Sequence, residues 1–270
     1  MPRLPYFEIH AFSDPAMPFS GNPAGVCLME EFPADKVLLG IAASNNLSET
    51  AFVVPTGEDT WHLRWFTPAV EVDLCGHATL SAGAVLFGEN AVKGESAKFD
   101  TLSGRLEVSQ DGERFAMDLP TIGYREGRPS DALQAAIGIE ASPDEVYDVE
   151  RIHGAGYQMW VMPHEGLVST ALPDYGLLRR HNTNIILTAP GRTTDFVSRF
   201  FAPASGVDED PVTGSAHCTL TPYWADRLGK SGLIARQIGQ RPGALEVEHK
   251  GDRVALHGHA PRYLEGEILV

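Results

Sequence analysis

The feature that most constrains this chain is a repeat between its two halves. The segment Arg64-Trp65-Phe66-Thr67-Pro68 leads to Gly76-His77-Ala78-Thr79, and the segment Arg199-Phe200-Phe201-Ala202-Pro203 leads to Gly214-Ser215-Ala216-His217. The two arginines are 135 positions apart, which is half of the 270 residues. Each copy reads as an aromatic strand, a proline turn, an acidic stretch and a small-residue helix that begins at a glycine. The repeat therefore predicts two related halves, each with its own helix start.

These two helix starts, at Gly76 and Gly214, indicate what the chain could bind. A helix N-terminus has unpaired backbone N–H groups and a partial positive charge, so it suits a carboxylate or a phosphate. If the two halves face each other, the natural site for a small anionic metabolite is the cleft between them.

The charge of the chain excludes some classes of partner. The formal net charge is −15 and the isoelectric point is about 5.0, whereas binding to nucleic acids or anionic membranes needs a basic protein face.

The first residues lack an apolar signal core, and no segment approaches the roughly 20 apolar residues of a membrane span. Three cysteines without regular spacing fit a reducing compartment. We expect a cytoplasmic protein that binds neither nucleic acid nor membrane.

The pattern of apolar residues is rich in strands. In the first half it predicts strands over 4–12, 24–29, 51–54, 61–66, 97–99, 105–110 and 114–118, and a helix from 33–34 to 45–46. The helix after Gly76 is small or apolar on every side, which is typical of a helix enclosed by strands. The polar segment from Gly123 to Pro129 predicts a boundary between halves 1–122 and 123–270.

The second half repeats this pattern less regularly. Its predicted strands cover 145–151, 159–162, 184–187, 196–201, 245–249, 254–257 and 267–270. The helix predicted over 216–228 contains Pro222, which should kink it or shift its start. Strands and helices do not alternate as in a Rossmann sheet, and the glycines form no phosphate loop or dinucleotide fingerprint.

Glu49 is the first candidate for proton transfer. It lies between a predicted helix and the apolar run Ala51-Phe52-Val53-Val54, so its carboxylate could be held at the edge of a core. From local sequence alone, a solvated or capping role is the more common one for such a residue.

Two further residues, one in each half, could assist. His77, just inside the first helix, could donate to an anion or move a proton, and the positive helix end should favour its neutral form. Asp210 precedes Pro211 and could be a turn acceptor or a second carboxylate of the site. The neighbouring Asp208 and Glu209 have no such turn position, and we interpret both as solvated.

Other site chemistries lack their signatures. His257 and His259 are a lone pair without a third ligand in sequence reach, so no metal site is predicted. The serine hydrolase elbow Gly-x-Ser-x-Gly is absent, and Ser215 near His217 does not make a triad.

Five motifs read in order carry a family resemblance. They are Gly21-Asn22-Pro23, Ser48-Glu49-Thr50-Ala51-Phe52, Arg64-Trp65-Phe66-Thr67-Pro68, Leu74-Cys75-Gly76-His77-Ala78-Thr79 and Asp210-Pro211-Val212-Thr213-Gly214-Ser215-Ala216. With them, nearly the whole chain resembles the PhzF-like, phenazine-biosynthesis-type isomerase family. The resemblance implies the α+β, diaminopimelate epimerase-like fold: two pseudo-symmetric halves, each a barrel-like sheet around a central helix, with the active site between them.

The resemblance also assigns roles to residues. It implies that Glu49 transfers the proton, that His77 and Asp210 assist, and that Gly76, Gly214 and Ser215 hold the substrate. Related epimerases use two facing cysteines at the helix starts. Cys75 occupies the first of these positions, but the stretch from Asp210 to Ser215 has no cysteine, which disfavours a two-thiol racemase.

The implied activity is a cofactor-independent isomerisation in which Glu49 takes a proton from carbon and returns it elsewhere on a small carboxylic acid. The resemblance also suggests a homodimer. Two alternatives stay open. One is a cysteine-independent epimerase or racemase of an amino-acid-like acid, and the other is a binding protein that has lost activity.

Overall fold

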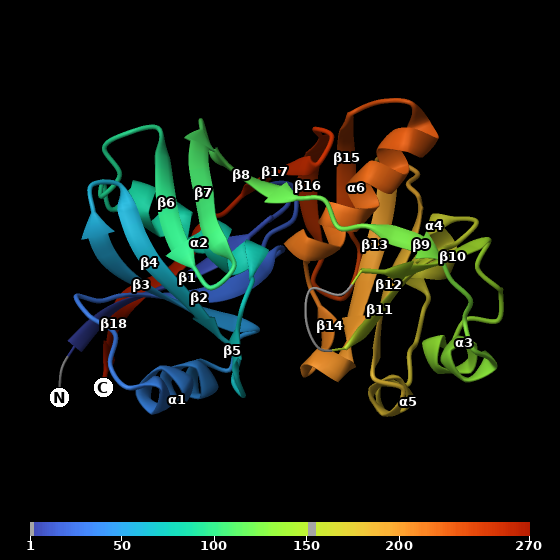
Figure 1. The fold of residues 1–270 in the computed structure, drawn as a ribbon, viewed down its shortest axis with the longest axis horizontal. Coiled ribbons are helices and arrows are strands. Elements are labelled where there is room, and N and C mark those ends of the chain that lie inside the picture. Colours follow the sequence, from blue (N-terminus) through green and yellow to red (C-terminus); the bar gives the residue numbers. More distant parts are fainter. Residues whose placement is uncertain (1–2, 151–154) are drawn as a thin grey trace. The chain divides into compact units, whose positions relative to one another are not determined.

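The computed structural model describes residues 3–150 and 155–270. The chain forms two compact units (Figure 1). Unit 1 consists of the chain up to Leu119 together with Ala255–Val270, and unit 2 is Pro120–Val254. No helix in the described ranges is long and apolar enough to cross a membrane.

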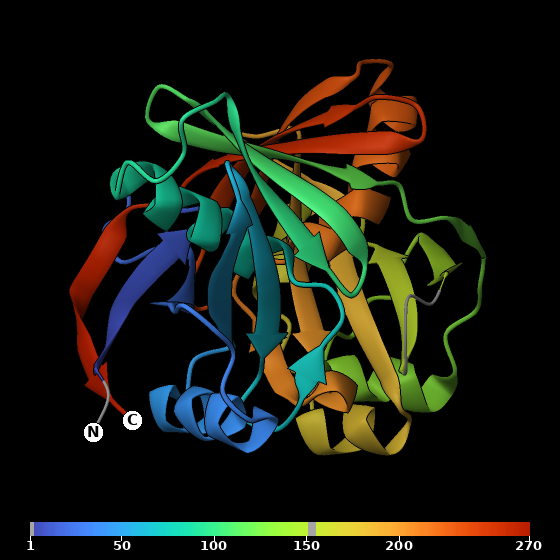
Figure 2. The same cartoon turned by 60° about the vertical axis from the view of Figure 1, so that its left-hand side comes forward.

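The two units differ from the predicted halves 1–122 and 123–270 at both ends. The segment from Gly123 to Pro129 contains a short strand, β9 (Tyr124–Glu126), and the division falls just before it. The last residues of the chain belong to unit 1 because β18 (Arg262–Leu269) pairs antiparallel with β1 (Arg3–Ala11), beside which it lies in Figure 2. Pairing between the two ends of a chain leaves no local signal in the sequence.

Unit 1 is a curled sheet. Besides β1 and β18, its strands are β2 (Asn22–Leu28), β3 (Glu49–Gly57), β4 (Thr60–Phe66), β5 (Glu71–Val72), β6 (Ser96–Thr101), β7 (Gly104–Asp111), β8 (Arg114–Pro120) and β17 (Arg253–His259). The strand order is β18-β1-β2-β3-β4-β6-β7-β8, and β8 also pairs with β17, which leads directly into β18. The pairs β2/β3 and β4/β6 are parallel, and the small β5 pairs with β4.

This sheet encloses the helix α2 (Gly76–Gly88), of which every residue from Gly76 to Leu86 is buried. The helix packs on β1, β2, β3, β6 and β7, so the predicted enclosed helix is confirmed. Its small residues allow the close approach: a Cβ atom at Gly83 would lie 2.5 Å from Cγ1 of Val108 on β7. The outer helix α1 (Asp35–Asn45) ends at Asn46, which has a φ of 52°.

Unit 2 has the strand order β9-β10-β11-β12-β13-β15-β16, with β14 on β13. The strands after β9 are β10 (Glu145–Val149), β11 (Gly156–Val161), β12 (Thr183–Pro190), β13 (Phe196–Ala202), β14 (Val207–Asp210), β15 (Gly232–Gln237) and β16 (Gly243–His249). The helices are α3 (Asp131–Ile137), α4 (Glu165–Ser169), α5 (Tyr175–Arg180), α6 (Gly214–Leu228) and the 3₁₀ turn η1 (Pro203–Ser205).

The topology of unit 2 repeats that of unit 1. The pairs β11/β12 and β13/β15 are parallel, as β2/β3 and β4/β6 are, and the intervening pairs are antiparallel in both units. The helix α6 takes the place of α2 between β14 and β15. It begins at Gly214 and continues through Pro222 to Leu228, so the proline did not shift its start.

The predicted long strands and both central helices are present, while the shortest elements were missed. β5, β9 and β14 have two to four residues, and α3, α4 and α5 have five to seven, too few for a periodic pattern. β15 was also missed, although it has six residues. Of the strand predicted over 145–151, β10 covers Glu145–Val149, and Arg151 lies outside the described residues.

Candidate active site

Glu49 is the first residue of β3, which lies between β2 and β4. The turn that leads to it follows α1, whose last residue, Asn45, donates a side-chain hydrogen bond of 3.1 Å to Oγ1 of Thr50. The strand and this bond fix the backbone on both sides of the carboxylate. His77 is the second residue of α2, which packs on β3. Unit 1 thus brings Glu49 and His77 together.

The Glu49 and His77 side chains form a buried ion pair. Oε2 of Glu49 lies 3.2 Å from Nε2 of His77, and the two side chains are 15% and 5% exposed. The atoms are at ion-pair distance without the alignment of a hydrogen bond, and neither has a hydrogen-bond partner among the described residues. Buried polar atoms are normally paired. Both atoms are therefore suited to meet a polar or acidic group of a ligand.

Cys75 extends this contact on the other side of the imidazole. Its Sγ atom lies 3.6 Å from Nδ1 of His77, so each ring nitrogen faces a different neighbour. The three residues offer atoms within 4.8 Å of one another, a separation that could also suit a metal ion. Cys75 and Glu49 face different nitrogens of the imidazole, so the three side chains lie in a row. We describe the cluster as a Cys75–His77–Glu49 chain.

The charge state of this chain follows from its contacts. Burial lowers the pKa of His77, but the neighbouring Cys75 and Glu49 outweigh it and hold that pKa well above 6.5. The predicted preference for neutral His77 is therefore wrong, because a carboxylate at 3.2 Å has a stronger effect than the helix end. Burial raises the pKa of the Cys75 thiol to about 11. Cys75 is therefore the thiol of the chain, and the raised pKa of His77 favours its imidazolium form.

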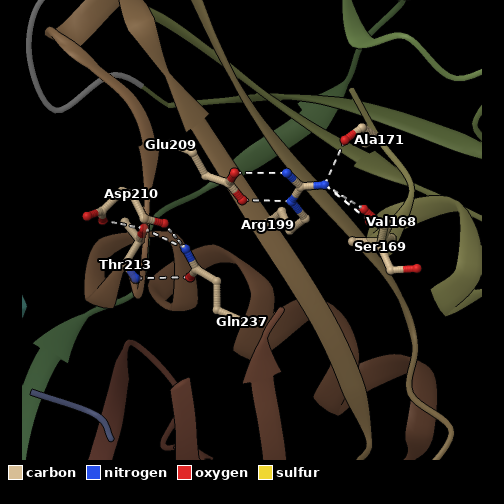
Figure 3. Close-up of polar contacts among 8 residues, drawn as sticks. All are labelled: Val168, Ser169, Ala171, Arg199, Glu209, Asp210, Thr213 and Gln237. Carbon is tan, nitrogen blue, oxygen red and sulfur yellow. Dashed lines mark hydrogen bonds and ion pairs between the residues drawn. The ribbon is translucent and has the colours of Figure 1, made fainter. Parts of the chain in front are cut away.

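Asp210, in unit 2, is the last residue of β14 and accepts a hydrogen bond of 2.5 Å from Oγ1 of Thr213 (Figure 3). Thr213 is the N-cap of α6, and Gly214 and Ser215 are the first two residues of that helix. Asp210 therefore accepts a hydrogen bond within the turn that leads into α6. The imidazole of His217 bonds to the start of its own helix, because its Nδ1 atom donates to the Thr213 carbonyl at 2.8 Å.

Glu209 is not solvated, which corrects the sequence interpretation. Its carboxylate accepts two hydrogen bonds from the guanidinium of Arg199, of 2.7 and 2.8 Å, and the two side chains are 13% and 8% exposed (Figure 3). The strand β13 brings Arg199 beside β14, a pairing that the sequence did not predict. Asp208 is 54% exposed as expected, although it also pairs with Arg179 at 2.8 Å.

The same ion pair occurs in unit 1. Arg64 on β4 donates two hydrogen bonds of 2.7 Å to Glu71 on β5. In both units the pair ties the segment before the central helix to the preceding aromatic strand. The repeat read from the sequence thus preserves a structural contact at each helix start.

Neither central helix is capped by a hydrogen bond from its N-cap side chain, which is Cys75 in α2 and Thr213 in α6. The first N–H groups of each helix, including those of Gly76, Gly214 and Ser215, are therefore not used by such a cap. In unit 1 the helix start adjoins Glu49 and His77, and in unit 2 it adjoins Asp210.

Sequence reasoning missed one residue of this region, Gln237. Its buried amide contacts both Asp210 and Thr213. It is the last residue of β15, a strand that the sequence did not predict, and no local motif marks it.

Known proteins are similar to this chain over nearly its whole length. The family model described as phenazine biosynthesis-like protein, PhzC-PhzF, matches residues 9–266. An uncharacterized isomerase of Pseudomonas aeruginosa is 44% identical over 267 residues, which are 98% of each chain. The crystal structure of a PhzF-family phenazine biosynthesis protein from Enterococcus faecalis superposes with a TM-score of 0.91, at 38% identity and over 100% of both chains.

A more distant structure shows the fold alone. The structure of a probable proline racemase from Agrobacterium radiobacter superposes with a TM-score of 0.65 at 10% identity, over 99% of this chain and 93% of that one. The epimerase-like α+β fold expected from the sequence is thereby confirmed.

Proposed function

The chain belongs to the phenazine biosynthesis-like (PhzF) family and is an isomerase, and from this premise we propose that Glu49 carries a proton between two carbon atoms of a small carboxylic acid. The reaction proposed needs no cofactor. The observation that carries the proposal is the buried contact of Glu49 with His77, in which Oε2 and Nε2 have no hydrogen-bond partner among the described residues.

The contact suits Glu49 to act as a base and then as an acid. The carboxylate would accept a proton from a carbon next to a carbonyl or a double bond, and the resulting carboxylic acid would return it to another carbon. Microscopic reversibility allows one group to do both. A positioned acid–base group of this kind typically contributes about 10² to 10⁴ in rate.

His77 supports the charge changes of this cycle. Its imidazolium, held by the raised pKa, stabilises the carboxylate of Glu49 before the transfer. When Glu49 takes up the proton, the same imidazolium is free to donate from Nε2 to the anion that forms on the substrate. Cys75 on the opposite nitrogen keeps the ring oriented.

Each helix start would suit an acidic group of a substrate. Gly76 in unit 1, and Gly214 with Ser215 in unit 2, offer backbone N–H groups that the N-cap side chains leave unused. Asp210 would assist as a second acid–base group. These assignments and the choice of a small anionic substrate follow the sequence prediction.

A cysteine-independent epimerase is the second candidate, in which Glu49 would again move the proton. The thiol of Cys75 lies at the start of α2 in the same chain as Glu49, but burial raises its pKa to about 11 and makes it a poor base. The corresponding position of α6 is Thr213, so a reaction between two thiols is disfavoured. An epimerase would exchange the proton at one carbon, whereas an isomerase would move a double bond.

The test is deuterium incorporation from D₂O into a panel of unsaturated and amino-hydroxy carboxylic acids, followed by proton NMR. The variants are Glu49→Gln, which keeps the shape but removes the base, and Glu58→Gln as the matched control on an exposed turn. We expect incorporation with the wild type and Glu58→Gln, and a loss of at least about 100-fold with Glu49→Gln. Incorporation that survives in Glu49→Gln would refute the role of Glu49.

The labelled position separates the remaining candidates. Label at a carbon distinct from the one that loses its proton indicates the isomerase, and label at one inverted carbon indicates the epimerase. Binding of an acid from the panel without any incorporation would support the catalytically silent binding protein instead.

A further inference from the structure

Gln237 is a buried polar residue whose amide makes three hydrogen bonds to one turn. It is 1% exposed and ends β15. Its Oε1 atom accepts from the backbone N–H of Thr213 at 3.0 Å, and its Nε2 atom donates to the backbone carbonyl of Asp210 at 2.6 Å and to Oγ1 of Thr213 at 3.2 Å (Figure 3). One amide thus spans both ends of the turn from Asp210 to Thr213.

These bonds control the hydroxyl of Thr213. A threonine at the N-cap normally accepts a hydrogen bond from its own helix, but Thr213 makes no such bond. Its hydroxyl instead donates to the carboxylate of Asp210 at 2.5 Å and accepts from Gln237. The amide of Gln237 therefore sets the direction of the hydroxyl proton, which orients the carboxylate.

The other side of the turn is held independently. Glu209, next to Asp210, is fixed by the two hydrogen bonds from Arg199, and Arg199 also donates to the carbonyl of Ala171 at 2.8 Å (Figure 3). With Glu209 held on one side and Thr213 on the other, the backbone of Asp210 has little freedom. The side chain of Gln237 reaches the carboxylate of Asp210 through the hydroxyl of Thr213.

We propose that Gln237 is a positioning residue of the isomerase, which holds the Asp210–Thr213 turn so that Asp210 and the first N–H groups of α6 meet the substrate in a fixed geometry. The proposal rests on the proposed function, in which these groups contact the substrate. Gln237 itself acts only through Asp210 and Thr213.

The amide is the one side chain of this length that can fill the role. It must accept from a backbone N–H and donate to a backbone carbonyl at the same time. A glutamate carboxylate keeps the acceptor but cannot donate, and a leucine keeps the approximate volume but does neither. These two substitutions therefore separate the two bonds.

The experiment compares wild type, Gln237→Leu, Gln237→Glu and the matched control Gln240→Leu, which alters an exposed glutamine three positions further along the chain. Two quantities are measured: the hydrogen exchange of the Thr213 amide without substrate, and kcat and KM for an acid that takes up deuterium. With Gln237→Leu we expect at least about 10-fold faster exchange at Thr213, because its acceptor is gone, with unchanged exchange in β10 and β11.

The kinetic result should separate positioning from a structural role. With both Gln237 variants we expect kcat to fall about 10- to 100-fold and KM to change less. A displacement of Asp210 and of the start of α6 by about 1 Å is enough for such a loss. Gln237→Glu should keep the protection of Thr213 while losing kcat, and Gln240→Leu should change neither.

The proposal is overturned if Thr213 stays protected in Gln237→Leu, or if kcat is unchanged once protection is lost. It is also overturned if the loss of kcat merely follows faster exchange throughout unit 2. A wild type that is inactive with every acid would refute the proposed function alone, because the exchange of Thr213 is read without substrate.

Discussion

His217 makes unit 2 sensitive to acid. It is the fourth residue of α6 and is fully buried, with Nδ1 donating to the carbonyl of Thr213 at 2.8 Å and its ring 5.9 Å from that of Phe196. Because a carbonyl only accepts, the neutral ring carries its proton on Nδ1. Nε2 has no hydrogen-bond partner among the described residues, so charging the ring would bury an unpaired donor. Burial accordingly lowers the pKa of His217 to about 4.

The sign of the effect on stability follows from linkage. In the unfolded chain the histidine has a pKa of about 6.5. Between pH 6.5 and about 4 the unfolded state binds a proton that the folded state does not, so stability is fully present above pH 6.5 and falls as the pH drops. Below about pH 4 both states are charged and the loss stops. At roughly 1.4 kcal/mol for each pKa unit, the full loss is about 3.5 kcal/mol, most of it above pH 4.

The assay is urea unfolding of the wild type, His217→Gln and the control His181→Gln, at pH values from 7.5 to 4. His181 is exposed, so its replacement should leave the pH dependence as it is. The wild type and the control should lose about 3 kcal/mol more than His217→Gln between pH 6.5 and 4. Carboxylates titrate in the same range and affect all three proteins equally. Equal slopes in the three proteins would refute the reasoning.

Three more predictions concern packing, pairing and reactivity. Gly83→Ala should reduce the free energy of unfolding, measured in urea, by about 1 to 3 kcal/mol, because the added Cβ would lie 2.5 Å from Cγ1 of Val108. A smaller loss would show that β7 can move away from the added methyl group. Glu209→Gln should cost about 3 kcal/mol in the same assay, since it leaves the buried charge of Arg199 without its partner, and a neutral result would contradict this. At pH 8, Cys75 should resist iodoacetamide in the folded protein and react with it in urea, because burial raises its pKa to about 11. Mass spectrometry that finds the label on Cys75 of the folded protein would contradict this.

Much of the fold could be predicted because its signals are local. Alternating residues marked β1, an all-round apolar pattern marked α2, and Asn46 at the end of α1 supplied the left-handed residue that the helix needs. The assignment of the last residues to unit 1 could not be predicted, because it depends on pairing between β1 and β18, at opposite ends of the chain.

The candidate site divides in the same way. Glu49 and His77 could be proposed from motifs, since each stands at a recognisable strand or helix start. The raised pKa of His77 could not be predicted, because it depends on tertiary contacts such as the 3.2 Å approach of Glu49. Gln237 escaped prediction because its function is defined only by what lies beside it in unit 2.

The repeat finally suggests where the two units diverged. Both retain the arginine–glutamate pair before the central helix, Arg64 with Glu71 and Arg199 with Glu209, and both leave the helix without a side-chain cap. A scaffold that has to present a helix start requires these features in either copy. The residues around the helix start differ, however, and a local difference on a preserved scaffold is expected where the two copies perform different chemistry.

Unit 1 places three titratable groups, a thiol, an imidazole and a carboxylate, in one chain, Cys75–His77–Glu49. Unit 2 places a hydroxyl, a carboxylate and an amide around Thr213, and the amide of Gln237 does not titrate. The first arrangement suits proton transfer and the second suits holding a group in place. A thiol at the second helix start should therefore not turn the protein into a two-thiol racemase. Thr213→Cys would supply that thiol but would remove the hydroxyl that orients Asp210. We therefore expect this variant to lose activity without gaining racemisation, which deuterium incorporation at the inverted carbon would contradict.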